Sequence, residues 1–234
     1  MTLDHSIIRL SINPKGFGEN PDELTQDMFA SELPVQHSHD YFCDEESGHY
    51  IGVWDTTDMV EAAGPYEFEE FMVVLEGRAQ IKNNQTNVID TINAGESFII
   101  PKGYDCQWIQ EGYLRKFYVI AENSAVESSE PENAISNVII LPNDGDVESQ
   151  VSYQNNSGNF TAGIYKGNVE ESPIALSKHH RFIYIKQGSL TLIDHNLTEH
   201  HFKEGDAFII LNGAQLGWRS DQEILHHYVE LVSK

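Results

Sequence analysis

The sequence predicts an all-β protein built from two related domains in tandem. Two long stretches repeat at a constant offset of 111 residues, from Gly52 against Gly163 to Gly77 against Gly188. The repeated segments are short, rich in Val, Ile, Phe and Tyr, and separated by Gly, Asn and Pro, which is typical of strands joined by turns. Because this period exceeds any solenoid unit, it indicates a duplicated domain.

Individual strands can be placed within each copy. Residues 78–81 and 189–192 alternate between apolar and polar side chains, the period of a half-buried strand. Each segment follows a Gly that allows a turn with positive φ. Residues 83–85 and 194–196 are polar and predict hairpin loops. The one helix that we expect is a short segment within residues 21–29.

The first copy carries an insertion. Residues 7–10 resemble residues 138–141 at an offset of 131 rather than 111, so about twenty extra residues lie in the first copy. A Ser-, Glu-, Asn- and Pro-containing segment without apolar periodicity separates the copies. The sequence therefore predicts a first domain at 1–122 with an insertion around 17–49, a linker at 123–137 and a second domain at 138–234.

The composition excludes several classes of partner. The chain has 37 acidic and 14 basic residues, a formal charge of −23, so we expect neither nucleic acid nor an anionic membrane surface as partner. No apolar run is long enough to cross a bilayer, and the N-terminus has no signal-peptide pattern, so we expect a cytoplasmic protein. With only Cys43 and Cys106, we expect no disulfide framework.

Two motifs resemble those of the cupin superfamily. Glu70 to Gly77 is similar to the end of the first cupin motif, and Gly95 to Gly103 is similar to the second. The latter stretch most resembles the ureidoglycine aminohydrolase-type cupins, and the second copy has Leu211 in place of its Pro. The resemblance covers most of the chain. It implies a bicupin, two tandem double-stranded β-helix barrels of the jelly-roll type, each with an internal cavity.

The metal ligands of the family are mostly missing. Cupin metals are usually held by His-x-His, the Glu and a later His. In the first copy these places hold Gly64 and Tyr66 (or Ala63 and Pro65), Glu70 and Cys106; in the second they hold Ala175, Ser177, Arg181 and Leu216. The Glu-x-His set of the aminohydrolases is also not supplied. Because a single carboxylate cannot hold a divalent transition ion, we expect no metal and no other cofactor in the barrels.

Strand periodicity shows which side chains replace those ligands. If Glu70 points into its barrel, as the family resemblance implies, residues two positions apart share its face, so Tyr66 and Phe68 point with it. The same argument applies to the second copy around Arg181. The second cupin-like motif of each copy adds Cys106 and Trp108 to the first cavity and Trp218 to the second. The predicted ligand-binding residues are therefore Tyr66, Glu70, Cys106 and Trp108 in the first cavity, and Ser177, His179, Arg181 and Trp218 in the second.

Each candidate has a structural alternative. Glu70 could pair with a buried cation such as Arg78 or Arg115. Arg181 could bind a carboxylate or phosphate through its planar fork, or pair with an acid of its own barrel. Trp108 and Trp218 suit core or rim packing, and Cys106 suits an inert buried thiol better than a nucleophile.

A second, weaker metal hypothesis concerns the insertion. His37 and His39 would share a face of an extended segment, and Cys43 or His49 could complete a metal site. The segment lies outside the motifs that carry the cupin resemblance, and His-x-His is common by chance, so the sequence argues against this metal site more than for it.

The leading functional hypothesis is a small-molecule-binding bicupin without the usual metal ligands, with an accessory or regulatory role in amino-acid or ureide metabolism. The alternatives are a metal-dependent or Glu70-dependent hydrolase or isomerase of a small nitrogenous metabolite, and a purely structural role. The contrast of Glu70 with Arg181 predicts an anionic ligand for the second cavity. The first should take a neutral or cationic group, or stay closed. We expect a monomer or a homodimer.

Overall fold

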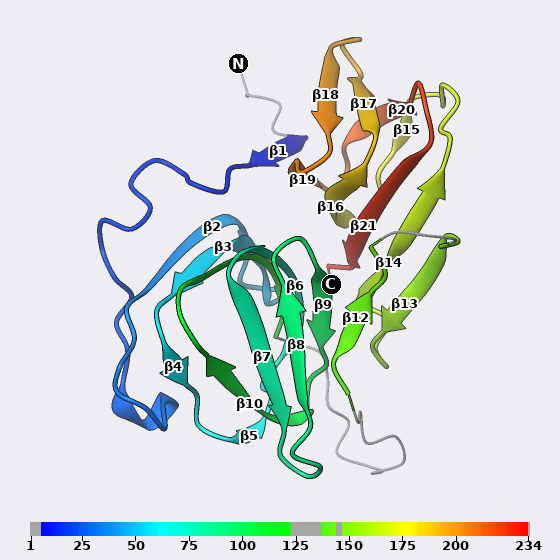
Figure 1. The fold of residues 1–234 in the computed structure, drawn as a ribbon. Coiled ribbons are helices and arrows are strands. Elements are labelled where there is room, and N and C mark those ends of the chain that lie inside the picture. The colour runs from blue at the N-terminus through cyan, green and yellow to red at the C-terminus, as the bar shows by residue number, and fades with distance from the viewer. Residues whose placement is uncertain (1–5, 123–136, 144–146, 234) are drawn as a thin grey trace. The chain divides into compact units, whose positions relative to one another are not determined.

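The fold is all-β, as the sequence predicts (Figure 1). The structure is a computed structural model, and it describes residues 6–122, 137–143 and 147–233. Within these residues the expected short helix is a single 3-10 turn, η1 (Gln26–Met28). No helix in the described part of the chain has the length and apolarity needed to cross a membrane. The expected linker falls almost wholly on residues 123–136, outside the described residues.

The chain divides into two compact units, residues 12–142, here called the N-terminal barrel, and residues 1–11 with 143–234, the C-terminal barrel. The N-terminal barrel has a six-stranded sheet in the order β12-β9-β6-β11-β3-β2 and a smaller sheet in the order β4-β10-β7-β8, with β5 pairing with β10. Its strands are β2 (Gln36–Asp44), β3 (His49–Thr56), β4 (Met59–Val60), β5 (Gly64–Pro65), β6 (Glu69–Glu76), β7 (Arg78–Asn83), β8 (Ile89–Asn93), β9 (Ser97–Ile100), β10 (Asp105–Gln110), β11 (Leu114–Ala121) and β12 (Ile139–Leu141).

The C-terminal barrel repeats this plan, with sheets in the orders β1-β19-β16-β21-β14-β13 and β15-β20-β17-β18. Its strands are β1 (Ile7–Leu10), β13 (Gln150–Gln154), β14 (Phe160–Gly167), β15 (Ala175–Leu176), β16 (His180–Gln187), β17 (Ser189–Asp194), β18 (Glu199–Lys203), β19 (Ala207–Ile210), β20 (Gln215–Arg219) and β21 (Ile224–Leu231). The two tandem barrels of cupin type that the sequence predicts are therefore present.

The similar segments 7–10 and 138–141, which begin the two repeats in the sequence, form equivalent edge strands. Each pairs with a strand of the other repeat. Strand β1 pairs with β19 of the C-terminal barrel, with Ile8 opposite Ile209. Strand β12 pairs with β9 of the N-terminal barrel in the same register, with Ile139 opposite Ile99. Residues 7–10 therefore belong to the larger sheet of the second repeat.

Two repeated glycines are explained by close packing. A Cβ on Gly52 would lie 2.3 Å from the Tyr118 hydroxyl, and one on Gly163 would lie 2.7 Å from the Tyr228 hydroxyl. Each tyrosine therefore crosses the face of a neighbouring strand where a side chain is missing. Gly77 and Gly188 have φ of +79° and +82° in the turns after β6 and β16, a conformation that favours Gly.

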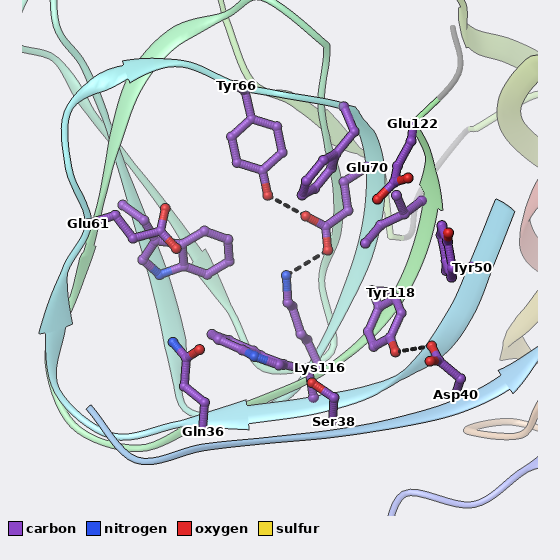
Figure 2. A pocket seen from close by; sticks show the side chains of 14 residues that line it. Gln36, Ser38, Asp40, Tyr50, Glu61, Tyr66, Glu70, Lys116, Tyr118 and Glu122 are labelled. Atoms are coloured by element: carbon purple, nitrogen blue, oxygen red, sulfur yellow. Dashed lines mark hydrogen bonds and ion pairs between the residues drawn. The ribbon is translucent and has the colours of Figure 1, made fainter. Parts of the chain in front are cut away.

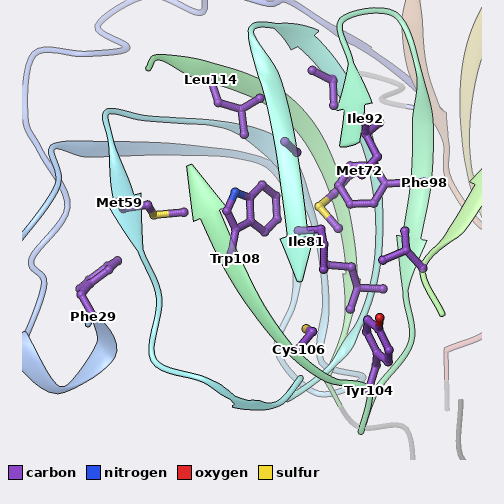
Figure 3. Packing of buried hydrophobic residues seen from close by; sticks show 14 residues of the cluster. Phe29, Met59, Met72, Ile81, Ile92, Phe98, Tyr104, Cys106, Trp108 and Leu114 are labelled. Atoms are coloured by element: carbon purple, nitrogen blue, oxygen red, sulfur yellow. The ribbon is translucent and has the colours of Figure 1, made fainter. Parts of the chain in front are cut away.

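The core of the N-terminal barrel is a cluster of buried apolar side chains between its two sheets. Figure 3 shows Cys106 and Trp108, two positions apart on β10, pointing into one apolar cluster with Met72 and Phe98. The equivalent cluster of the C-terminal barrel is built around Ile183, Leu192, Phe208 and other apolar residues of β16, β17 and β19. Each barrel thus buries an apolar core of its own.

Candidate functional site

The N-terminal barrel contains a cavity of about 340 Å³ (Figure 2). Side chains of β2, β3, β6 and β11 and of β10 in the smaller sheet line it, together with residues 61, 66, 68 and 122, which lie outside the strands. The lining residues are Gln36, Ser38, Asp40, Tyr50, Trp54, Glu61, Tyr66, Phe68, Glu70, Trp108, Lys116, Tyr118, Ile120 and Glu122. Three of the four predicted residues, Tyr66, Glu70 and Trp108, are therefore at the cavity, and Cys106 lies in the core beside it.

A buried ion pair forms the centre of this cavity. Lys116 Nζ donates to Glu70 Oε1 at 2.7 Å, and the Tyr66 hydroxyl donates to the other carboxylate oxygen of Glu70. The side chains of Glu70 and Lys116 are 3% and 7% exposed. The Lys116 ammonium also lies 4.8 Å from the ring centroids of both Trp54 and Trp108. A carboxylate with both oxygens bonded to donors suits an electrostatic role better than proton transfer.

The cation that partners Glu70 is Lys116, and neither Arg78 nor Arg115 fills this place. Arg78 pairs with Glu111 at the surface, at 2.8 Å. Arg115 lies directly opposite Asp55 on β3 and pairs with its carboxylate at 3.2 Å. Successive residues of a strand point to opposite faces, and β11 pairs with β6 in unbroken register from Lys116 to Ala121, with Ile120 opposite Glu70. Lys116 therefore faces the cavity while Arg115 faces the other side of the sheet.

Glu61 is a cavity residue that periodicity could not indicate, because it lies between two strands of two residues each. Its backbone N–H donates to the Trp108 carbonyl at 3.0 Å, and its carbonyl accepts a 2.9 Å bond from Gln107 Nε2. Its carboxylate has no hydrogen bond or ion pair with any described residue. Burial raises the pKa of Glu61 to about 7, with Lys116 opposing and Glu70 adding to the shift.

Cys106 has the properties of an inert thiol. It is 5% exposed within the apolar cluster, and burial raises its pKa to about 12, with Glu61 and Asp105 adding to the shift. Because the thiolate is the reactive form, such a thiol is a poor nucleophile and a poor metal ligand. Cys43 is exposed, and both cysteines are free.

The C-terminal barrel has two adjoining cavities of about 570 and about 560 Å³. They share Ser172, Arg181, Trp218 and Glu230. All four predicted residues of this barrel, Ser177, His179, Arg181 and Trp218, line the second of them. The first is lined by aromatic and aliphatic side chains together with a few polar groups: Ser149, Gln150, Val151, Ile164, Tyr165, Val169, Ser172, Arg181, Trp218, His226, Tyr228 and Glu230.

Arg181 pairs with an acid of its own barrel, one of the two alternatives that the sequence left open. Its Nη2 donates to Glu230, the residue directly opposite on β21. The pair is only partly buried, with side chains 37% and 25% exposed. The guanidinium carbon lies 5.9 and 5.8 Å from the rings of Trp218 and Tyr228. Its Nε and Nη1 have no hydrogen-bond partner among the described residues.

His226 is a second residue that the sequence did not indicate as a site residue. It is 4% exposed, stacks on Tyr165 at 5.2 Å, and its Nδ1 has no hydrogen-bond partner among the described residues. Burial, with the Arg181 charge adding to it, lowers the His226 pKa to about 3. The imidazole is therefore neutral at physiological pH. His226 aligns with Lys116 in the repeat, and this alignment is the sequence signal that could have indicated His226 as a cavity residue.

The described residues contain no group of three or more His, Cys, Asp or Glu side chains placed to hold a metal ion. His37 Nδ1 instead bonds to Asp55 Oδ1 at 2.8 Å, and the His39 ring contacts the Tyr41 ring edge-on at 4.7 Å. His37 thus belongs to a polar cluster with Asp55, Arg115 and Tyr113 outside the cavity.

Comparisons with known proteins agree with this architecture. The EutQ-like cupin domain family matches residues 44–118. A protein with unknown function from Pseudomonas syringae pv. tomato is structurally similar at a TM-score of 0.71, with 16% identity over 96% of this chain and 99% of that one. A Cupin 2 conserved barrel domain protein from Leptotrichia buccalis gives 0.61, with 12% identity over 87% and 99%. A search of curated proteins gives no match.

More distant likeness extends to an enzyme. The oxalate decarboxylase of Lactobacillus farciminis, in its formate complex, gives a TM-score of 0.51 with 11% identity over 100% of this chain and 88% of that one. At such identities the likeness shows the fold alone. The domain match and the shared fold together support a place in the cupin superfamily. The narrower resemblance to the ureidoglycine aminohydrolase type stays a prediction.

Proposed function

We propose that this protein is a small-molecule-binding bicupin whose C-terminal barrel takes up a small carboxylate with an apolar body. The observation that carries the proposal is the position of Arg181, a partly exposed guanidinium with a single hydrogen bond, between two adjoining cavities. A guanidinium presents five N–H donors in a planar fork, so Nε and Nη1 are free to bind a carboxylate.

The walls of the larger cavity support an apolar ligand body. Tyr165, Trp218 and Tyr228 provide aromatic surface, and Ile164 and Val169 provide aliphatic surface. The neutral His226 adds one polar group without a charge. Largely apolar walls with a few convergent polar groups are typical of small-molecule sites, and the volume of about 570 Å³ lies in their usual range.

The charges around Arg181 favour an anion over a cation. Arg181 and Glu230 balance each other, and Lys178 is the remaining charged side chain of the second cavity. The N-terminal cavity, in contrast, has four carboxylates and one ammonium. In a chain with a net charge of −23, a cavity lining without excess negative charge is the better site for a carboxylate.

The test is calorimetric titration with benzoate and butyrate, with benzamide as the uncharged counterpart of benzoate. We expect benzoate to bind, benzamide to bind at least about tenfold more weakly, and Arg181→Gln to abolish benzoate binding. Glu230→Gln should tighten binding, because it removes the competing carboxylate. Arg219→Gln, which breaks an exposed pair with Glu199, is the matched control and should change nothing. Equal binding by the Arg181 variant, or binding that requires an added metal, would contradict the proposal.

A Glu70-dependent enzyme has less support. Both oxygens of Glu70 are bonded, to Lys116 and to Tyr66, and its side chain is 3% exposed. A substrate would have to displace one of these donors before Glu70 could accept a proton. The accessory or regulatory role in amino-acid or ureide metabolism, the cytoplasmic location and the monomeric or dimeric state remain predictions.

A further inference from the structure

We propose that the cavity of the N-terminal barrel binds a small organic cation, an alkylated or primary ammonium, with the Glu61 carboxylate as its counter-charge. This goes beyond the carboxylate site proposed for the other barrel and rests on different residues.

The charge of the cavity lining carries the first step. Asp40, Glu61, Glu70 and Glu122 line the cavity, and Lys116 is its one cation. The charge of Lys116 is matched by Glu70, and Asp40 accepts a 2.6 Å hydrogen bond from the Tyr118 hydroxyl. Three carboxylates remain without a balancing cation among the described residues. An anionic ligand would be repelled from this space, and a cationic one would be attracted.

The position of Glu61 carries the second step. Figure 2 shows its carboxylate pointing into the cavity from the side opposite Tyr50 and Glu122, toward the space in front of Glu70 and Lys116. Two backbone hydrogen bonds, with Trp108 and Gln107, hold Glu61 in place while its carboxylate stays unpartnered. A fixed, partly buried carboxylate without a partner is a site that a ligand ammonium can satisfy.

The aromatic walls carry the third step. The cavity is lined by Tyr50, Trp54, Tyr66, Phe68, Trp108 and Tyr118. The Lys116 ammonium already lies 4.8 Å from two of these rings, so the indoles of Trp54 and Trp108 present faces that accept a cation. Aromatic faces combined with carboxylates are the chemistry that recognises ammonium groups in proteins.

The protonation of Glu61 gives this site a signature. Its pKa of about 7 results from burial, with Glu70 raising it further and Lys116 lowering it. Tyr66 and Cys106 also face it but are neutral at this pH, because burial raises both of their pKa values. Asp40 and Glu122 line the same cavity. A bound cation favours the ionised carboxylate, so binding near neutral pH should release a proton, and affinity should rise with pH.

The test uses choline, ethanolamine and 3,3-dimethylbutan-1-ol, the uncharged carbon counterpart of choline. We expect choline or ethanolamine to bind in calorimetric titrations, and the uncharged alcohol to bind at least about tenfold more weakly. Titrations at about pH 7 in buffers of different ionisation enthalpy should show proton release, and affinity should increase between about pH 6 and about pH 8.

Variants locate the site. Glu61→Gln should weaken binding at about pH 8 by about tenfold or more and remove the proton release. Glu67→Gln, at an exposed residue outside the cavity lining, is the matched control and should behave as the wild type. Arg181→Gln should leave cation binding unchanged, so that failure of the carboxylate site and failure of this one can be told apart.

The proposal is overturned if neither cation binds, if the alcohol binds as well as choline, or if Glu61→Gln retains wild-type affinity. The proton release is measured on the unmodified protein, so it decides the matter even if Glu61→Gln does not fold. Cation binding without proton release near neutral pH would show that Glu61 is not the counter-charge of the bound cation, and would also overturn the proposal.

Discussion

The two barrels share a scaffold but invert the polarity of the ion pair at their centres. In the N-terminal barrel the acid, Glu70, is on β6 and the base, Lys116, is on β11. In the C-terminal barrel the base, Arg181, is on β16 and the acid, Glu230, is on β21. The first pair is almost fully buried, whereas the second is about one-third exposed. Glu70 and Arg181 are equivalent in the repeat, whereas their partners are not, because Lys116 aligns with His226. The duplicated fold thus contains a buried ion pair in one barrel and a more accessible one in the other.

The comparison also shows where the charge of each cavity comes from. Glu70 and Arg181, which aligned in the sequence, differ in charge, but each is balanced by a partner within its own barrel. The difference in charge that a ligand would meet comes from residues outside the motifs. These are Glu61, Asp40 and Glu122 in the N-terminal cavity, and Lys178 in the cavity of about 560 Å³ in the C-terminal barrel. The cavity that we propose for an anion is therefore chosen by the charge of its whole lining, and not by one aligned residue.

Lys116→Met should give the largest effect, because it leaves the Glu70 carboxylate buried without its cation. We expect the N-terminal barrel to lose about 3–5 kcal/mol of unfolding free energy. Denaturant unfolding followed by Trp54 and Trp108 emission measures it. The double variant with Glu70→Gln should recover much of the loss. A loss below about 1 kcal/mol would mean that the pair is solvated rather than buried.

Deletion of residues 1–11 should destabilise the C-terminal barrel and leave the N-terminal barrel unchanged, because it removes β1 from the edge of β19. We expect the C-terminal barrel, reported by Trp218 emission, to lose about 2–3 kcal/mol, roughly the burial of Leu10 with its edge pairing. Deletion of residues 1–5 keeps β1 and is the control. If the N-terminal barrel were the one destabilised, the assignment of β1 to the second repeat would be wrong.

Acid should destabilise the C-terminal barrel through His226. Its pKa is about 3 in the folded protein against an ordinary 6.5, so the unfolded chain takes up the proton first. The stabilising contribution is complete above about pH 6.5 and is lost as the pH falls toward 3, about 2 kcal/mol of it by about pH 5. Trp218 emission in denaturant at several pH values measures this loss. His226→Phe should remove this part of the dependence, and an unchanged pH profile in that variant would contradict it.

Glu61 should have the opposite dependence in the N-terminal barrel. Its pKa is raised from 4.5 to about 7, so its contribution to stability is present below about pH 4.5 and is lost as the pH rises through 7. Glu61→Gln should therefore be more stable than the wild type at about pH 8, by about 1–2 kcal/mol, and should gain little at about pH 4. Thermal unfolding at both pH values checks this, and a gain of equal size at both would exclude the titration as its cause.

Arg181→Ala should have the smallest effect on stability, below about 1 kcal/mol, because a partly exposed ion pair contributes little. The loss of unfolding free energy for Arg181→Ala should be much smaller than that for Lys116→Met in the same measurement, because the ion pair of Arg181 is partly exposed and that of Lys116 is buried. A cost of several kcal/mol for Arg181→Ala would show that this pair is as buried as that of Lys116 and would remove it as a ligand site.

Much of the fold and part of the site could be predicted from periodicity and repetition. The strands, the duplication and the inward direction of Tyr66, Glu70, Trp108 and Arg181 follow from local patterns that the structure repeats. The second cupin-like motif places Cys106 at the cavity, but in the structure this side chain packs in the apolar core beside it. The cation that pairs with Glu70 also differs from the expected Arg78 or Arg115, because Lys116 meets Glu70 only through the pairing of β11 with β6, strands far apart in the sequence.

By itself, the sequence determined that this is a duplicated all-β protein with cupin-like motifs and few of their metal ligands, because strand periodicity and repeats are local properties of the chain. Only the tertiary structure decided that β1 pairs with β19, that Lys116 neutralises Glu70, and that Glu61 and His226 face the cavities. Strand pairing joins residues far apart in the sequence, and a shift of one residue turns each side chain to the other face. The charge inside each barrel therefore depends on contacts that local patterns do not contain.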